Sequence, residues 1–474
     1  MLFRKNYLNK LFEISSIPIS IIGAIFFALV VNILFLTCFF ISQGSFDTFI
    51  SGDGDGYLEL AKNLANGNGF VRNTAEGYIF ETFRTPGLPS LLAVFFLSGS
   101  GLVGYFFTLS ILSSIIIPLC TWYIGSRLFS NIVGIISAWL ITLEPLIYLH
   151  NWLLLTEIPY LIVFLIGVTT YIKYFKSKNY LTLAIVGILL AFSVYIRPGA
   201  LLLIVVPTFT LAIYLFFYKF SQFLRLKFIV LIFFLVLTPW IMYIHSITSV
   251  YAVSGTGWRN VYTDYLASLR SINNETTFAV EKNKLKAFAT ETWGFSSTDI
   301  NDPANSKILR DYSLAEIYND IPLVIKLQSL LFISYFTHTD YFARLVRLDV
   351  ITAPSTNRSS VTQLFLSRGL KSLPEIFSSL RSQYFMPILE RVWSLSLFIF
   401  ATVGFFSNYK NRIIWLIFLV LALGYLSSSA IGLGIEGRLR IPLLPFYLFL
   451  TSLGIITVYN IFYKNILVKY EKKN

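Results

Sequence analysis

Long apolar runs alternate with short polar stretches along most of the 474-residue chain. Charged side chains are absent from residues 14–46, 85–126, 198–218, 413–435 and 441–463. Because about 20 consecutive apolar residues in a helix cross a membrane core, this pattern predicts transmembrane helices. We expect ten of them, near residues 17–41, 101–124, 132–150, 153–172, 180–196, 199–218, 228–246, 387–407, 413–433 and 441–463.

Two further apolar stretches do not fit this scheme. Residues 88–98 are too short to cross a membrane and predict a re-entrant or interfacial segment. Residues 322–337 are short and contain Lys326, which favours an amphipathic helix on the membrane surface; a further span is the open alternative. The first run follows a basic segment but lacks a cleavage site of small residues, so we interpret it as a retained anchor rather than a signal peptide.

The connections between the predicted spans differ in charge on the two sides of the membrane. Every second connection is basic, and together these six hold sixteen Lys and Arg residues against only Glu13 and Glu471. Their charge is therefore +14, while the whole chain has a formal net charge of +13. Positive residues accumulate on the cytoplasmic side, which predicts a multi-pass protein of the cytoplasmic (inner) membrane with both termini in the cytoplasm. The basic connections are 1–13, 125–131, 173–179, 219–227, 408–412 and 464–474.

The composition agrees with a membrane protein and excludes some classes of site. Hydrophobic residues make up 56% of the chain and charged residues 13%, against about 25% charged in soluble proteins. The basic balance follows from topology and from attraction to anionic lipids, and does not indicate nucleic-acid binding. Cys38 and Cys120 both lie in predicted spans, which rules out a cysteine-rich metal site, and the three histidines are scattered.

Two long extracytoplasmic regions interrupt the spans. The first loop, 42–88, is acidic, whereas 259–381 mixes both charges with aromatic residues and predicts a folded cap. We therefore expect an all-α polytopic membrane protein of about 10–12 transmembrane helices with extracytoplasmic interfacial helices and a mixed cap. Its expected parts are an N-terminal transmembrane module (1–246), the cap with interfacial helices (247–386) and the C-terminal transmembrane helices (387–474).

The first loop contains the richest candidate chemistry. Asp53 and Asp55 alternate with glycines directly after the first span, and Tyr57 opens a spacing typical of a short helix on the membrane surface. A carboxylate here could take a proton from an acceptor hydroxyl or amine, or could hold a divalent cation. The alternative is that Asp-Gly pairs are ordinary turn and helix-cap residues.

Other charged residues lie at the extracytoplasmic ends of later spans. Glu157 opens one of them, and an acid so close to a membrane is a candidate functional residue, or else simply caps the helix. Arg197 begins another outer turn. Arg438 and Arg440 lie on the side where topology disfavours positive charge, so we expect an anionic partner, either Glu436 or a phosphate held by two hydrogen bonds.

Taken in order, these residues resemble the GT-C superfamily of membrane glycosyltransferases. The resemblance is to the family 39-like branch related to protein O-mannosyltransferases and lipid A aminoarabinose transferases, and it covers about 450 residues. The sequence departs from the family pattern at two places: Gly54 replaces a second acid, and Met242 and Tyr243 stand where an arginine is often found. The matching positions are Asp53, Tyr57, Ala61, Leu64, Gly67, Arg84, Pro86, Pro89, Glu157, Arg197, Pro198, Pro239, Trp240, Gly255, Asn260, Arg438, Arg440, Pro442 and Pro445.

The resemblance implies a polyprenyl-phosphate-linked sugar donor and an acceptor (lipid, glycan or protein) on the extracytoplasmic face. Asp53 is then the leading catalytic candidate as general base or acceptor-orienting acid, with Asp55 and Glu157 after it. No cofactor is certain, and a divalent cation on Asp53 and Asp55 is open. The donor phosphate would contact Arg84, Arg197, Arg438 and Arg440, and the acceptor or sugar would contact Tyr57, Glu81 and Trp258.

Two other classes of function are alternatives. A transporter or flippase for a lipid or lipid-linked sugar typically has ionisable residues near the membrane midplane and internal repeats, whereas the charges here lie at helix ends and no repeat is visible. A polymerase or ligase of surface polysaccharide is the other alternative, and it typically lacks an acidic first loop. The chain contains no nucleotide-binding phosphate loop, serine-hydrolase motif or zinc-protease motif.

The charge asymmetry gives a direct topological test. Single cysteines placed at 258–260 should react with a membrane-impermeant thiol reagent added outside intact cells, whereas those at 410–412 should react only after permeabilisation. Labelling in the reverse pattern would overturn the assignment of all the candidate residues to the extracytoplasmic face.

Overall fold

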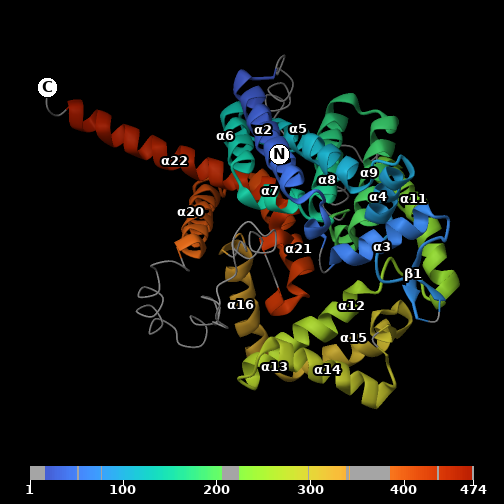
Figure 1. Cartoon of the computed structure of the whole chain (residues 1–474). Helices are drawn as coiled ribbons and strands as arrows, with labels where there is room; N and C mark the ends of the chain where they lie inside the picture. Colours follow the sequence, from blue (N-terminus) through green and yellow to red (C-terminus); the bar gives the residue numbers. More distant parts are fainter. Residues whose placement is uncertain are drawn as a thin grey trace.

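The computed structural model consists of helices and one short β-hairpin (Figure 1). It describes residues 17–50, 53–75, 77–204, 224–296, 298–337, 341, 385–434 and 437–471. The α-helices and strands are α2 (Ile19–Gln43), α3 (Asp53–Ala65), β1 (Val71–Thr74), β2 (Gly77–Phe80), α4 (Gly87–Leu97), α5 (Gly101–Leu128), α6 (Asn131–Thr142), α7 (Pro145–Asn151), α8 (Glu157–Ser177), α9 (Tyr180–Ile196), α11 (Leu224–Thr248), α12 (Thr256–Asn260), α13 (Leu266–Asn273), α14 (Phe278–Trp293), α15 (Ser306–Asn319), α16 (Ile321–Thr337), α20 (Phe385–Ser407), α21 (Arg412–Ser429) and α22 (Leu444–Glu471). Short tight turns of helix are η1 (Asp47–Phe49), η2 (Pro198–Ile204), η5 (Asp299–Asn301), η6 (Pro303–Asn305), η8 (Gly432–Gly434) and η9 (Gly437–Leu443), and η4 (Val261–Tyr265) is a wider π-helical turn.

Seven of the described helices are long and apolar enough to cross a membrane, and two bent pairs raise the number to nine if each is one span. The chain is thus a multi-spanning membrane protein, and the expected all-α polytopic class is confirmed. Residues 88–98, predicted to be re-entrant or interfacial, form most of the short apolar helix α4. The predicted span 180–196 is α9, which at 17 residues is shorter than the helices counted as spans. The predicted domain boundaries stay a prediction.

Besides shifts of a few residues at other helix ends, the structure differs from the expected spans in the following ways. The predicted span 132–150 is two helices, α6 and α7, that meet at 52°. Helix α8 begins at Glu157, four residues later than the span predicted from 153. Of the predicted span 199–218, the first residues form η2 and the rest lies outside the described residues. Apolar content alone does not distinguish a continuous helix from a broken one of the same length.

The break between α6 and α7 has a local cause. Pro145 at the first position of α7 has no backbone N–H to continue α6, and its ring favours the start of a new helix. The side chain of Glu144 caps this new helix by accepting from the N–H of Leu146 at 3.4 Å. A buried carboxylate is therefore placed where the chain turns.

Small residues bring several membrane helices into close contact. At Gly454 of α22, an added Cβ would lie 1.8 Å from the carbonyl oxygen of Phe400 on α20, and one at Gly404 would lie 2.0 Å from that of Leu450. Apolar side chains gain little by leaving lipid for another helix, so such contacts depend on close backbone packing. The glycine pair therefore fixes α20 against α22.

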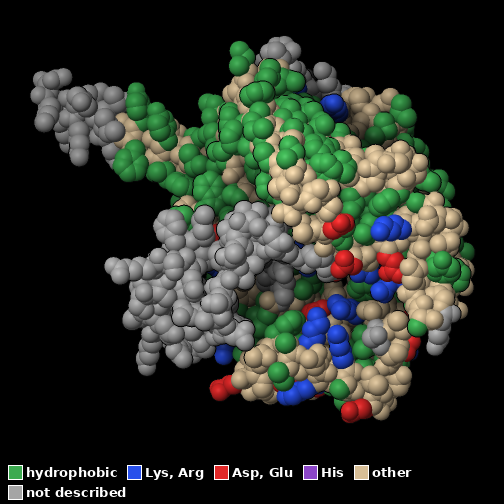
Figure 2. All heavy atoms as spheres, in the orientation of Figure 1, with side chains coloured by type: hydrophobic (Ala, Val, Ile, Leu, Met, Phe, Trp, Pro, Cys, Tyr) green, Lys and Arg blue, Asp and Glu red, His purple; other side chains and the backbone are tan. Residues whose placement is uncertain are grey.

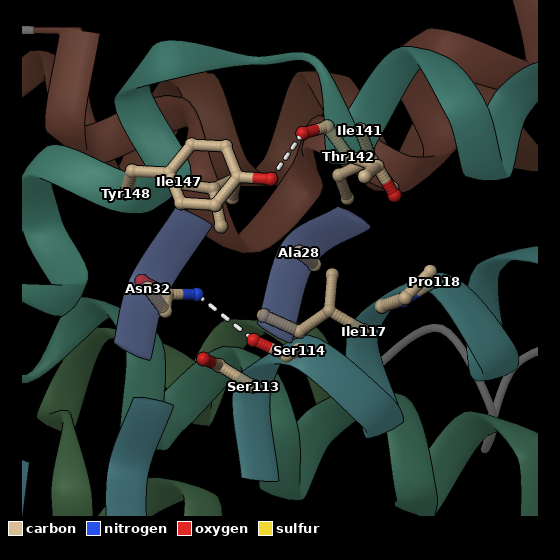
Figure 3. Close-up of a pocket in the computed structure, with 10 residues that line it drawn as sticks. All are labelled: Ala28, Asn32, Ser113, Ser114, Ile117, Pro118, Ile141, Thr142, Ile147 and Tyr148. Carbon is tan, nitrogen blue, oxygen red and sulfur yellow. Dashed lines mark hydrogen bonds between the residues drawn. The ribbon is translucent and has the colours of Figure 1, made fainter. Parts of the chain in front are cut away.

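A polar cluster holds the first membrane helix inside the bundle (Figure 3). The Asn32 side chain on α2 donates to Ser114 Oγ on α5 at 2.9 Å and accepts from Asn151 Nδ2 and Trp152 Nε1, both at 3.0 Å. The cluster borders a cavity of about 10 Å³, which is at the lower limit for one water molecule. Because a polar group in lipid is costly when unpaired, these bonds select one position for α2.

Helices α12–α16 form a cap at one end of the bundle, seen below it in Figure 1. Aromatic residues make its core, with the Trp293 ring 5.4 Å from Tyr312 and 5.6 Å from Tyr262. Several hydrogen bonds join the cap to the bundle side. Gly255 N–H donates to Thr82 O at 3.2 Å, and Leu433 N–H donates to Ser268 Oγ at 2.7 Å. Helix α16 also accepts from the Tyr425 hydroxyl at Gln328 O (2.9 Å) and from Arg440 at Tyr335 O (3.0 Å). A hollow lies between bundle and cap, and Figure 2 shows acidic and basic side chains gathered around it.

Candidate functional site

The first turn of α3 carries two of the predicted acids, Asp53 and Asp55, and both are exposed. Between and after them, Gly54 and Gly56 are buried. An added Cβ would lie 3.0 Å from the Leu154 carbonyl oxygen at Gly54, and 2.5 Å from the guanidinium carbon of Arg84 at Gly56. The glycines therefore let the start of α3 fit between the segment before α8 and an arginine, and the close approach is to protein groups.

Asp53 forms an ion pair with Arg438, which lies 385 residues later on η9. Arg438 Nη1 is 3.3 Å from Asp53 Oδ2. The Asp53 side chain is 54% exposed and that of Arg438 21%, so the pair is accessible from outside the protein. Glu436, the partner considered from the sequence, lies outside the described residues. Asp55 is exposed, and no ion pair involves it in the described part of the chain.

A second ion pair, more deeply buried than the first, joins Glu157 and Arg197. Glu157 begins α8, and its Oε1 is 3.0 Å from Nη1 of Arg197, the residue that ends α9. Glu157 is buried, and its Oε2 has no hydrogen-bond partner among the residues that the structure describes. The charge of Arg438 also acts on Glu157, so Arg438 faces two carboxylates. One carboxylate oxygen in this pair is thus left to accept a hydrogen bond.

Glu81 positions Arg84. Its Oε1 accepts from the backbone N–H of Phe83 at 2.6 Å and of Arg84 at 3.0 Å, and its Oε2 lies 3.7 Å from both Arg84 and Arg72. The guanidinium of Arg84 then lies 5.3 Å from the centre of the Tyr57 ring, in cation–π range. Glu81 was expected to contact acceptor or sugar, and in the structure it is buried beneath the arginine.

Tyr57 joins these pairs into one group. Removal from water, together with the charge of Asp53, raises the pKa of its hydroxyl to about 12, and Arg84, Glu157 and Arg197 also act on it. Tyr57 therefore stays protonated at neutral pH and can donate a hydrogen bond. We call this group the charged cluster; its members are Asp53, Tyr57, Arg84, Glu157, Arg197 and Arg438.

Arg440 lies apart from the open face of the cluster although it is only two residues from Arg438. It is 1% exposed, and its Nη1 donates to the carbonyl oxygens of Tyr335 (3.0 Å) and Phe336 at the end of α16. Its charge also acts on the buried Glu144. Arg440 therefore caps the C-terminus of α16, a position that cations favour, and fixes η9 against it.

The cap contributes a residue that sequence reasoning did not single out. This residue is Arg259, which follows Trp258 on α12. Trp258 itself, which was expected to contact the acceptor or sugar, is half-buried. Beside it, Arg259 pairs with Asp264 at 2.9 Å and lies 5.5 Å from the Phe83 ring, whose other neighbour is Arg84 at 5.6 Å. The signal that could have found Arg259 is that it is the basic residue in the stretch from Gly255 to Asn260. Through the shared contact with Phe83, Arg259 of the cap lies next to Arg84 of the charged cluster.

The donor set does not favour a metal ion. Among the described residues, no group of three or more His, Cys, Asp or Glu side chains lies close enough together to hold one. Asp53 is paired with an arginine, whose charge opposes a cation at the same oxygen. A divalent cation shared by Asp53 and Asp55 therefore finds little support in their surroundings.

Comparisons with known proteins add a likeness of fold. No protein-family model matches the sequence, and no curated protein matches it. Among solved structures, it is similar to the Archaeoglobus fulgidus oligosaccharyltransferase AglB in complex with an inhibitory peptide and a dolichol-phosphate (TM-score 0.44, 12% identity, 90% of this chain and 48% of that one). The apo form of an A. fulgidus oligosaccharyltransferase gives TM-score 0.47 and 12% identity over 98% of this chain and 52% of that one. The chain spans about half the length of these proteins, and likeness at this level shows neither a shared family nor a shared activity.

The packing of Gly56 predicts an indirect effect on Arg84. In Gly56→Ala the new methyl group would displace the guanidinium, while stability changes little because the arginine end is flexible and alanine favours helices by about 1 kcal/mol. Binding of a polyprenyl phosphate, the ligand expected from the sequence, should weaken as much as in Arg84→Ala. The double variant should be no worse than either single one. Gly257→Ala, with open space around it, is the control; additive losses would show that Gly56 acts by another route.

The burial of Arg440 predicts a structural role. Arg440→Ala leaves two carbonyl groups and Glu144 without their cation, and breaking a buried pair costs about 3–5 kcal/mol. We expect a clear fall in thermal stability in detergent, monitored by tryptophan fluorescence. Arg310→Ala, at an exposed pair with Asp311, should cost less than about 1 kcal/mol. Unchanged stability of Arg440→Ala together with weaker lipid-phosphate binding would instead favour the role expected from the sequence.

Proposed function

We propose that this protein is a GT-C-type membrane glycosyltransferase that moves a sugar from a polyprenyl-phosphate-linked donor to an acceptor on the extracytoplasmic face. The observation that carries the proposal is the contact between Asp53 and Arg438 within the charged cluster. An acid exposed to a hollow and surrounded by arginines suits a reaction that removes a proton and releases a phosphate. The hollow lies where membrane helices end beneath a cap, so a lipid-linked substrate can reach it from the bilayer.

Asp53 would act as general base or orient the acceptor. In the first case its free carboxylate oxygen takes the proton of the acceptor hydroxyl, and the acceptor oxygen bonds to the anomeric carbon of the sugar. The bond between that carbon and the phosphate oxygen breaks, and the phosphate leaves with the electron pair. Protonated Tyr57 is suited to a hydrogen bond with a hydroxyl group of the sugar or acceptor, and the unpaired Oε2 of Glu157 is a further acceptor, buried beside it.

The arginines would supply the positive charge that the leaving phosphate needs. Each of these arginines has a carboxylate neighbour. The pair of Arg197 with Glu157 is the shortest at 3.0 Å, whereas Arg438 lies 3.3 Å from Asp53 and Arg84 lies 3.7 Å from Glu81. We assign the main phosphate contacts to Arg438 and Arg84. A phosphate that approaches Arg438 would compete with Asp53 for the guanidinium, so donor binding would free the carboxylate for the acceptor. Arg440 belongs to η9 and is buried against α16, so we assign it the structural role of holding η9 in place.

The charge asymmetry supports the sidedness of this proposal. The cap and the charged cluster belong to segments that the positive-inside pattern assigns to the extracytoplasmic side of the inner membrane. Nucleotide-activated sugars are made in the cytoplasm, so an activated sugar on the other side arrives on a lipid. The sugar and the acceptor have no signature among the described residues.

The central test is turnover of a synthetic polyprenyl-phosphate sugar by purified protein in proteoliposomes. Asp53→Asn should lower turnover by about 10²-fold or more, the scale for loss of a general base, while thermal stability is retained. Arg438→Ala should lower turnover and raise the donor KM, and Arg438→Lys should mainly raise KM because lysine replaces a bidentate contact poorly.

Asp55→Asn is the matched control, since Asp55 has the same chemistry on the same turn but faces no described cation. Its turnover should stay close to that of the unmodified protein. Full activity of Asp53→Asn would assign the proton transfer elsewhere, with Glu157 the next residue to replace. No transfer from any lipid-linked sugar, with lipid movement between leaflets instead, would favour a flippase.

A further inference from the structure

The β-hairpin in the first loop has an unusual surface for a small solvent-exposed sheet. Strands β1 and β2 pair antiparallel, with Val71 opposite Phe80 and Thr74 opposite Gly77. All four residues of β2 are exposed, including Tyr78 at 60% and Phe80 at 62%. Because successive residues of a strand point to opposite faces, Tyr78 and Phe80 lie on one face and Ile79 on the other. The strand is therefore apolar on both faces.

The hairpin is firmly attached at its base. Asn63 Nδ2 on α3 donates to Val71 O at 2.8 Å. Phe70, directly before β1, accepts at its carbonyl from the Tyr243 hydroxyl at 3.1 Å, and its ring packs edge-on to Trp240 at 5.4 Å. Both of these partners lie on α11. The exposed apolar side chains therefore belong to an anchored element with a defined level in the molecule.

That level is the end of a membrane span. The apolar part of α11 runs over Lys227–Thr248, so Tyr243 lies in its last two turns. Exposed apolar residues continue there, at Met242, Ile247 and Tyr251. Figure 1 shows the hairpin at the edge of the molecule beside α11, away from the cap core. The hairpin surface is thus continuous with the lipid-facing surface of α11.

We propose that the hairpin is a membrane-interface anchor that inserts Tyr78 and Phe80 into the headgroup region of the bilayer. Aromatic rings are enriched at this depth, where one end of the ring is apolar and the other wet. Apolar groups on both faces fit immersion among lipids better than docking on a single protein surface. Glu81 follows Phe80 directly and holds Arg84, so the anchor would also fix one arginine of the charged cluster relative to the membrane.

Spin-label accessibility in lipid nanodiscs tests the proposal without any assay of activity. The two native cysteines, Cys38 and Cys120, are first replaced. Single labels are then placed by Tyr78→Cys or Phe80→Cys and exposed to oxygen, which partitions into lipid, and to a water-soluble nickel chelate. Leu235→Cys, exposed in the middle of α11, is the lipid reference, and Val280→Cys, exposed on α14 of the cap, is the water reference.

The ratio of oxygen to nickel accessibility should be several-fold higher at 78 and 80 than at 280, and below that at 235. A ratio equal to that at 280 would overturn the proposal, since the hairpin would then lie in water. Low accessibility to both reagents would also overturn it, because a protein surface such as a second copy would cover the hairpin. If a label disturbs the strand, Ile79→Cys gives an independent measurement from the opposite face.

Discussion

The buried guanidinium of Arg440 is the contact on which the arrangement of the site depends. It holds two carbonyl groups at the end of α16 and faces Glu144, where α6 gives way to α7. Burial of a cation is costly unless acceptors surround it, so this position admits few alternatives. Because η9 is fixed here, Arg438 two residues earlier is directed to the hollow and meets Asp53.

Much of the architecture could be predicted from the sequence because a bilayer constrains it strongly. The apolar runs located most of the described membrane helices. The distribution of Lys and Arg between the connections predicted that the candidate polar residues lie together at the extracytoplasmic ends of the spans. Side chains at the same ends of packed helices are forced into the same layer, whatever their separation along the chain. That constraint is why Asp53, Glu157, Arg197 and Arg438 could be grouped before their contacts were known.

The remaining features depend on packing, which sequence patterns do not contain. Arg438 and Arg440 have nearly the same sequence surroundings, yet one borders the hollow and the other is enclosed by α16. The glycines that follow Asp53 make room for Leu154 and Arg84, which are distant in the sequence. Arg259 gave little signal because its neighbour Phe83 is distant in the sequence. In each case the outcome depends on which neighbours a residue packs against in three dimensions, and the spacing of residues along the chain does not determine this.

The attachment of the cap has a consequence for how molecules arrive. A backbone hydrogen bond from Gly255 joins it to the first loop at Thr82, and the backbone N–H of Leu433, near η9, donates to the side chain of Ser268 on α13. Helix α16 adds further bonds to Tyr425 and Arg440, so the cap is held at several separate places and differs from a lid on a single hinge. Under the proposed function, a lipid-borne donor would reach the hollow beneath this fixed cap by diffusion in the plane of the bilayer. The rate of loading would then follow the number of donor molecules per area of membrane, and dilution of the surrounding water would leave it unchanged.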